Sequence, residues 1–128
     1  MERILIVDDT EMSRELLAEF LEDKYEIVFA KNGREALNIL SIQMGKISAV
    51  LLDLLMPVMN GYEFLMEIRE RNWEDRFPVV VVTGDDSKVS RDRCRELGVT
   101  HYIVKPLKRK DAMAEISMAI NEYKSTYK

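Results

Sequence analysis

The stretch AVLLD, residues 49–53, is an apolar run that ends directly at a carboxylate. Three further runs have the same form, an apolar stretch followed at once by a polar side chain: ILIV at residues 4–7 before Asp8, VVVV at 79–82 before Thr83, and YIV at 102–104 before Lys105. A fifth strand is expected at YEIVFA, residues 25–30. Because most of these runs are continuously apolar rather than alternating, they predict parallel strands buried on both faces of a sheet.

Segments with the apolar spacing of amphipathic helices follow these runs. They are residues 12–21, the segment after Asn32-Gly33, the segment after Asn60-Gly61, residues 86–97 before the expected C-cap Gly98, and a last segment through Met113, Ile116, Ile120 and Tyr123. Five alternating strand–helix units predict an α/β fold, a doubly wound five-stranded parallel sheet with five flanking helices. We expect residues 1–128 to form a single domain.

Net charge, cysteine count and the length of the apolar stretches exclude several classes of protein. The 128 residues are 47% hydrophobic and 33% charged, and 23 acidic against 19 basic residues give a net charge of −4, which argues against a nucleic-acid-binding surface. The single cysteine, Cys94, excludes an internal disulfide and a cysteine-based zinc site. No signal-peptide core and no apolar stretch of about 20 residues is present, so we expect a cytoplasmic protein without membrane contact.

The polar residues after the strands are the candidate site, because ligands of open parallel sheets bind beyond the carboxyl ends of the strands. Asp8, Asp9, Asp53, Thr83 and Lys105 are expected to meet at this edge. Three carboxylates brought together favour a hard cation, and Mg²⁺ prefers oxygen ligands. A lysine and a hydroxyl suit phosphate oxygens, so the set indicates phosphoryl transfer, with a carboxylate as a possible nucleophile.

Each of these residues also has an ordinary structural role. Asp8 and Asp9 are suited to capping the next helix, and Asp53 to a loop. Thr83 taken alone is typical of a turn, and Lys105 of a solvated surface. The hypothesis of a site depends on their convergence at one edge of the sheet.

The chain resembles the receiver domain of two-component response regulators over essentially its whole length. The residues that carry this resemblance are ILIVDD at 4–9, LLDLLMPVMNG at 51–61, VVTG at 81–84 and YIVKP at 102–106. The resemblance implies a flavodoxin-like sheet with strand order 2-1-3-4-5. It also implies a phospho-acceptor that phosphorylates itself from small donors and slowly dephosphorylates, rather than an enzyme acting on an external substrate.

The resemblance assigns the acceptor and the metal site. Asp53 would take a phosphoryl group from a sensor histidine kinase, a phosphotransfer protein or a small phosphodonor. Asp9 would bind Mg²⁺ directly and Asp8 mainly through water. Asp53 itself and the backbone carbonyl of Leu55 would complete the protein ligands.

The resemblance also assigns the residues around the phosphoryl group. Thr83, Gly84 and Lys105 would bind it, with Gly84 small enough to admit the donor, and the bond before Pro106 would be cis. Thr83 and Tyr102 would be the switch pair: Thr83 moves to the phosphoryl group, and the Tyr102 ring turns inward.

Further expectations concern signalling. Leu55 and Asp85 would tune the lifetime of the phosphoryl group. The fourth helix, fifth strand and fifth helix, about residues 86–123, would control a downstream protein or a fused output domain, with a homodimer through this face as a further possibility. No direct nucleic-acid contact is expected. His101 is expected at the surface.

Two questions stay open at the level of sequence. The chain is either a stand-alone receiver, an interpretation favoured by its ending after the fifth helix, or a part of a longer regulator. The alternative function is a Mg²⁺-dependent phosphatase with Asp53 as a transient nucleophile, which would turn over an external phosphate ester.

Overall fold

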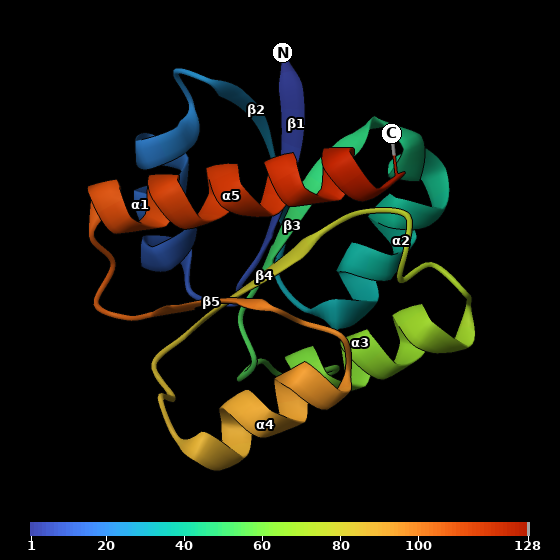
Figure 1. The fold of residues 1–128 in the computed structure, drawn as a ribbon. Coiled ribbons are helices and arrows are strands. Elements are labelled where there is room, and N and C mark those ends of the chain that lie inside the picture. The colour runs from blue at the N-terminus through green and yellow to red at the C-terminus, as the bar shows by residue number, and fades with distance from the viewer. Residues whose placement is uncertain (128) are drawn as a thin grey trace.

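Five parallel strands form one sheet in the order β2-β1-β3-β4-β5 in the computed structural model, which describes residues 1–127 (Figure 1). The strands are β1 (Glu2–Val7), β2 (Tyr25–Ala30), β3 (Ile47–Leu52), β4 (Val79–Thr83) and β5 (His101–Val104). The predicted fold class and strand order are confirmed. Several strands begin earlier than the apolar runs, β3 at Ile47 and β5 at His101, because backbone pairing extends past the continuously apolar residues.

Helices cover both faces of the sheet (Figure 1). They are α1 (Glu11–Leu21), α2 (Gly33–Gln43), α3 (Gly61–Glu70), α4 (Lys88–Glu96) and α5 (Arg109–Tyr127), with a short 3-10 helix η1 (Met44–Lys46) before β3. The apolar faces of α1 and α5 pack in one core, and those of α2, α3 and α4 pack in the other. In the part of the chain that the structure describes, no helix combines the length and apolar character needed to cross a bilayer.

Side-chain caps set where three of the helices begin. Asn32 and Asn60 accept hydrogen bonds from the backbone N–H groups of Glu35 and Glu63, at the starts of α2 and α3. The Ser87 side chain accepts a hydrogen bond from the backbone N–H of Ser90 at the start of α4. This helix therefore begins at Lys88, two residues later than the sequence indicated. The residues that α4 buries are Ser90 and Cys94, both small.

Gly61 lets the chain turn tightly from β3 into α3. Its N–H donates to the carbonyl of Leu54 at 2.9 Å. A Cβ atom at this position would lie 2.6 Å from the Asp53 carbonyl oxygen and 2.7 Å from Leu54 Cα, both backbone atoms. The loop after Asp53 can therefore keep this course only with a glycine here.

We predict that Gly61→Ala lowers the free energy of unfolding by about 1–3 kcal/mol, because backbone atoms must shift to admit the methyl group. The matched control is Gly45→Ala in η1, where the added Cβ meets no atom within 4 Å. Urea unfolding of both variants checks this. Equal stability of the two variants would contradict the proposed crowding.

Candidate functional site

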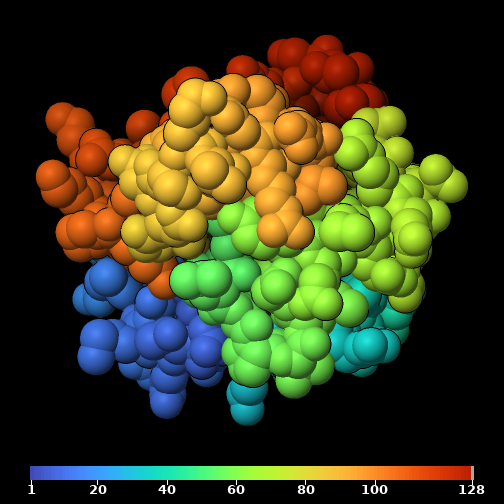
Figure 2. All heavy atoms as spheres, turned by 90° about the horizontal axis from the view of Figure 1, so that it is seen from below, coloured from blue at the N-terminus to red at the C-terminus, as the bar shows by residue number. Residues whose placement is uncertain are grey.

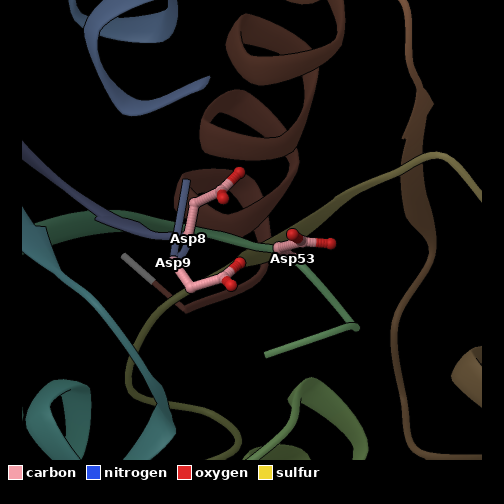
Figure 3. A group of neighbouring side chains, drawn as sticks. All are labelled: Asp8, Asp9 and Asp53. Atoms are coloured by element: carbon pink, nitrogen blue, oxygen red, sulfur yellow. The ribbon is translucent and has the colours of Figure 1, made fainter. Parts of the chain in front are cut away.

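Three carboxylates meet at the carboxyl edge of the sheet, where β1 and β3 end (Figure 3). The N–H of Asp53 donates to the Val7 carbonyl at 2.9 Å, which holds the two strand ends side by side. Asp8, Asp9 and Asp53 each offer an oxygen within 4.8 Å of the others. Asp8 and Asp53 are buried and Asp9 is exposed, so the cluster is open to solvent on the side of Asp9.

Lys105, at the end of β5, places its ammonium group among the buried carboxylates. Its Nζ lies 3.1 Å from Asp8 Oδ2 and 3.6 Å from Asp53 Oδ2. The peptide bond between Lys105 and Pro106 is cis. Lys105 Nζ also donates to Ser13 Oγ at 3.2 Å, a contact that the strand-end pattern did not reveal because Ser13 lies on α1.

The environment of Asp53 disfavours its charge. Burial raises the pKa of this carboxyl above its ordinary value; the Lys105 ammonium opposes that rise, and the Asp8 carboxylate adds to it. The Leu55 N–H also donates to Asp53 Oδ1 at 3.4 Å, while the Leu55 side chain is exposed. A further positive charge beside Asp53 would therefore stabilise its ionised form.

The donor set fits Mg²⁺. All three groups are carboxylates, which Mg²⁺ prefers, and two of them are buried at strand ends that the sheet holds in place. The alternative role of the aspartates, capping of the next helix, is not observed, because the N-terminus of α1 has no side-chain cap. Asp8 Oδ1 instead accepts from the Thr10 N–H at 2.9 Å. The acidic residues after β1 are thus not accounted for by helix capping.

Thr83 and Gly84 complete this edge at the end of β4. Thr83 is fully buried, and its Oγ1 accepts a hydrogen bond from the Asp85 N–H at 3.3 Å. The N–H of Lys105 donates to the Thr83 carbonyl at 2.8 Å, which ties the ends of β4 and β5 together. A Cβ at Gly84 would meet nothing within 4 Å, so packing does not require glycine there. In Figure 2, which views this edge, the segment after β1 (blue), the segment after β3 (green) and α4 (yellow to orange) lie together.

Tyr102 lies beside this edge with its hydroxyl group fully engaged. It donates to the Asp85 backbone carbonyl at 2.6 Å and lies 2.8 Å from Ser90 Oγ. The Arg91 guanidinium lies over the Tyr102 ring, 4.5 Å from the ring centre. Burial raises the pKa of Tyr102, so the phenol stays protonated and can donate.

The Asp85 carboxylate is engaged in the turn before α4. It accepts from the Ser87 N–H at 2.9 Å, and this hydrogen bond lowers the pKa of Asp85. The carboxylate thus already has a partner of its own in the turn.

The expectation that His101 lies at the surface is wrong. Its exposed fraction is 8% because the side chain at the start of β5 faces α5. There Nδ1 lies 3.0 Å from Glu115 Oε1, and Nε2 contacts the carboxylate of Glu122. Two carboxylates on one helix thus make a buried position suitable for histidine, which a strand pattern alone does not show.

Comparisons with known proteins agree on one family. The model of the response regulator receiver domain matches residues 4–117. The chain is 36% identical over 104 residues to a probable cyclic di-GMP phosphodiesterase of Vibrio cholerae, covering 81% of this chain and 23% of that protein. It is 32% identical over 124 residues to the transcriptional regulatory protein SrrA of Staphylococcus aureus, covering 96% of this chain and 49% of that protein.

Solved structures have the same fold. One is CheY in the CheX-CheY-BeF3-Mg²⁺ complex from Borrelia burgdorferi, with a TM-score of 0.84 and 26% identity. That match covers 91% of this chain and 87% of the other. Of the two curated relatives, the chain spans about a quarter of the Vibrio cholerae protein and about half of SrrA.

Proposed function

Because the chain belongs to the response regulator receiver domain family, we propose that it accepts a phosphoryl group on Asp53 and changes conformation in response. The observation that carries this proposal is the position of Asp53, buried at a strand end with Lys105 and two more carboxylates around it. The phosphoryl donor is a histidine kinase, a phosphotransfer protein or a small phosphodonor. The domain comprises residues 1–128 and acts in the cytoplasm.

Asp53 is the nucleophile in this proposal. One of its carboxylate oxygens forms a bond to phosphorus as the P–N bond of a phosphohistidine, or the P–O bond of acetyl phosphate, breaks. The product is an acyl phosphate, and the leaving group departs with the bonding electrons. Lys105 and the Thr83 hydroxyl would bind the phosphoryl oxygens, and Gly84 would be small enough to admit the donor.

Asp8, Asp9, Asp53 and the backbone carbonyl of Leu55 would hold Mg²⁺, which neutralises charge on the phosphoryl oxygens when bound. The exposed position of Asp9 leaves this site open to solvent. The likeness to the Borrelia CheY, whose complex contains BeF3 and Mg²⁺, supports the same ligand chemistry here.

The signal would leave through α4, β5 and α5, with Thr83 and Tyr102 as the switch pair. The recipient is a partner protein, a second copy of the chain or a fused output domain. The curated relatives named above are longer than the matched region, which supports a fused output domain in some members of the family. Leu55 and Asp85 would set the lifetime of the acyl phosphate.

Incubation with acetyl phosphate and Mg²⁺ is expected to add one phosphoryl group, about 80 Da in the intact mass. EDTA should prevent the addition because it removes Mg²⁺, and hydroxylamine should reverse it because the product is an acyl phosphate. A folded protein that gains no mass, or an adduct stable to hydroxylamine, would refute the proposal. Sustained hydrolysis of p-nitrophenyl phosphate would instead indicate a phosphatase.

A further inference from the structure

Three hydroxyl groups from three elements form a continuous hydrogen-bonded chain beside the acceptor edge. Tyr62 on α3 places its hydroxyl 2.7 Å from Ser90 Oγ on α4. Ser90 Oγ lies 2.8 Å from the hydroxyl of Tyr102 on β5, which reaches the Asp85 carbonyl at 2.6 Å. Ser90 is therefore the central member and the only one that contacts both tyrosines.

The donor and acceptor in each of these three hydrogen bonds follow from the Asp85 carbonyl, which is the last acceptor. A carbonyl oxygen only accepts, so the single hydroxyl proton of Tyr102 goes to Asp85. The Tyr102 oxygen then accepts from Ser90, and Ser90 in turn accepts from Tyr62. Ser90 and Tyr102 each donate one bond and accept one, and Tyr62 donates to Ser90.

Both ends of this series of hydrogen bonds are attached to the edge of the sheet that carries Asp53. Tyr62 follows Gly61, whose N–H donates to the Leu54 carbonyl directly after Asp53. At the other end, the Asp85 N–H donates to Thr83 Oγ1 at 3.3 Å. The hydrogen bonds thus connect the segment after Asp53 to Thr83, the residue that would contact the phosphoryl group, and they pass through Ser90 of α4.

Ser90 is buried, so water cannot readily take the place of its hydroxyl group. Its exposed fraction is 2%. Its backbone N–H donates to the capping Ser87 Oγ, which fixes the residue in the first turn of α4. Without the Ser90 hydroxyl, Tyr102 loses its donor and Tyr62 loses its acceptor.

We propose that Ser90 is a positioning residue that holds the half-buried Tyr102 ring against the core, with its hydroxyl on the Asp85 carbonyl, before any phosphoryl group arrives. This rests on the proposed function, in which the inward ring accompanies the phosphorylated state. Ser90 would favour that state in advance and so speed phosphoryl uptake by Asp53. Tyr62, attached next to the acceptor, keeps the Ser90 hydroxyl directed toward Tyr102.

A double-mutant cycle tests this proposal. Ser90→Ala is expected to slow phosphoryl uptake from acetyl phosphate by about 3- to 10-fold, the equivalent of one lost hydrogen bond. In the Tyr102→Phe background the same substitution should have little effect, because the hydroxyl that Ser90 positions is already gone. An equal slowing in both backgrounds would overturn the proposal, since it would show that Ser90 acts only through packing. The exposed Ser41→Ala on α2 is the matched control.

A second measurement does not depend on phosphorylation or on the stability of Ser90→Ala. The tyrosines are labelled with 3-fluorotyrosine, and Tyr102 is assigned by its loss in Tyr102→Phe. Ser90→Ala, or the milder Tyr62→Phe, should shift or broaden the ¹⁹F resonance of Tyr102 in unphosphorylated protein. An unchanged resonance in both variants would overturn the proposal. Absence of phosphoryl uptake in the wild type would refute the acceptor role, while the ¹⁹F spectra would still decide on Ser90.

Discussion

Asp53→Asn is expected to raise the free energy of unfolding near pH 7 by about 1 kcal/mol, while removing phosphoryl uptake altogether. The reason is the environment of this carboxyl: burial, reinforced by Asp8 and opposed by Lys105, raises its pKa in the folded protein. The unfolded chain therefore loses this proton at a lower pH than the folded chain does. Stability falls as pH rises from about 4 through the folded pKa, and an uncharged asparagine avoids that loss.

Thermal unfolding in EDTA at several pH values checks this prediction. The melting temperature of Asp53→Asn should exceed that of the wild type by several degrees at pH 7, about 4–8 °C per kcal/mol for a small domain. The difference should disappear near pH 3, where the Asp53 carboxyl of the wild type is protonated in the folded and in the unfolded chain. Glu19→Gln, an exposed substitution on α1, is the control for a change of net charge alone. A lower melting temperature for Asp53→Asn at pH 7 would contradict the prediction.

Lys105→Met is expected to destabilise the protein by about 2 kcal/mol at pH 7 without Mg²⁺. The substitution leaves the buried Asp8 and Asp53 facing one another without their ammonium partner. Breaking a fully buried pair costs about 3–5 kcal/mol, and the expected effect is smaller because the Lys105 side chain is 25% exposed. The loss of Lys105 also raises the pKa of Asp53 further, so the destabilisation should shrink as pH falls toward 4.

Urea unfolding at pH 7 and pH 4 measures this effect. Lys105→Arg, which keeps the charge but changes its shape, should retain much of the stability. In the Asp53→Asn background the cost of Lys105→Met should fall, since one of the two carboxylates is then neutral. The same cost in both backgrounds would show that the lysine stabilises the protein through Asp8 or its aliphatic chain and not through Asp53.

The sheet and its acidic edge could be predicted from sequence because both follow from the strands. Continuous apolar runs define buried parallel strands, and residues such as Asp8, Asp53 and Lys105 come directly after them. Their convergence then needs only the topology, and the structure places all three together. The roles of these residues in phosphoryl transfer stay a prediction.

The contacts that sequence reasoning missed depend on how helices pack against the sheet. Ser13 and Ser90 reach the site from α1 and α4, and nothing in a local pattern states which helical face will meet Lys105 or Tyr102. His101 was placed wrongly for the same reason, because its glutamate partners lie 14 and 21 residues further along the chain. Polar side chains at such distances are paired by tertiary packing and not by periodicity.

The sparse burial of α4 has an energetic consequence for signalling. The helix buries a serine and a cysteine, whereas α1 buries two leucines and α3 buries a phenylalanine, a leucine and an isoleucine in addition to Gly61. Less apolar surface must be returned to water when α4 opens locally, so we expect its opening free energy to lie below that of the sheet. In the proposed signalling role, remodelling of α4 would therefore return little apolar surface to water, and the sheet that carries Asp53 would keep its buried core.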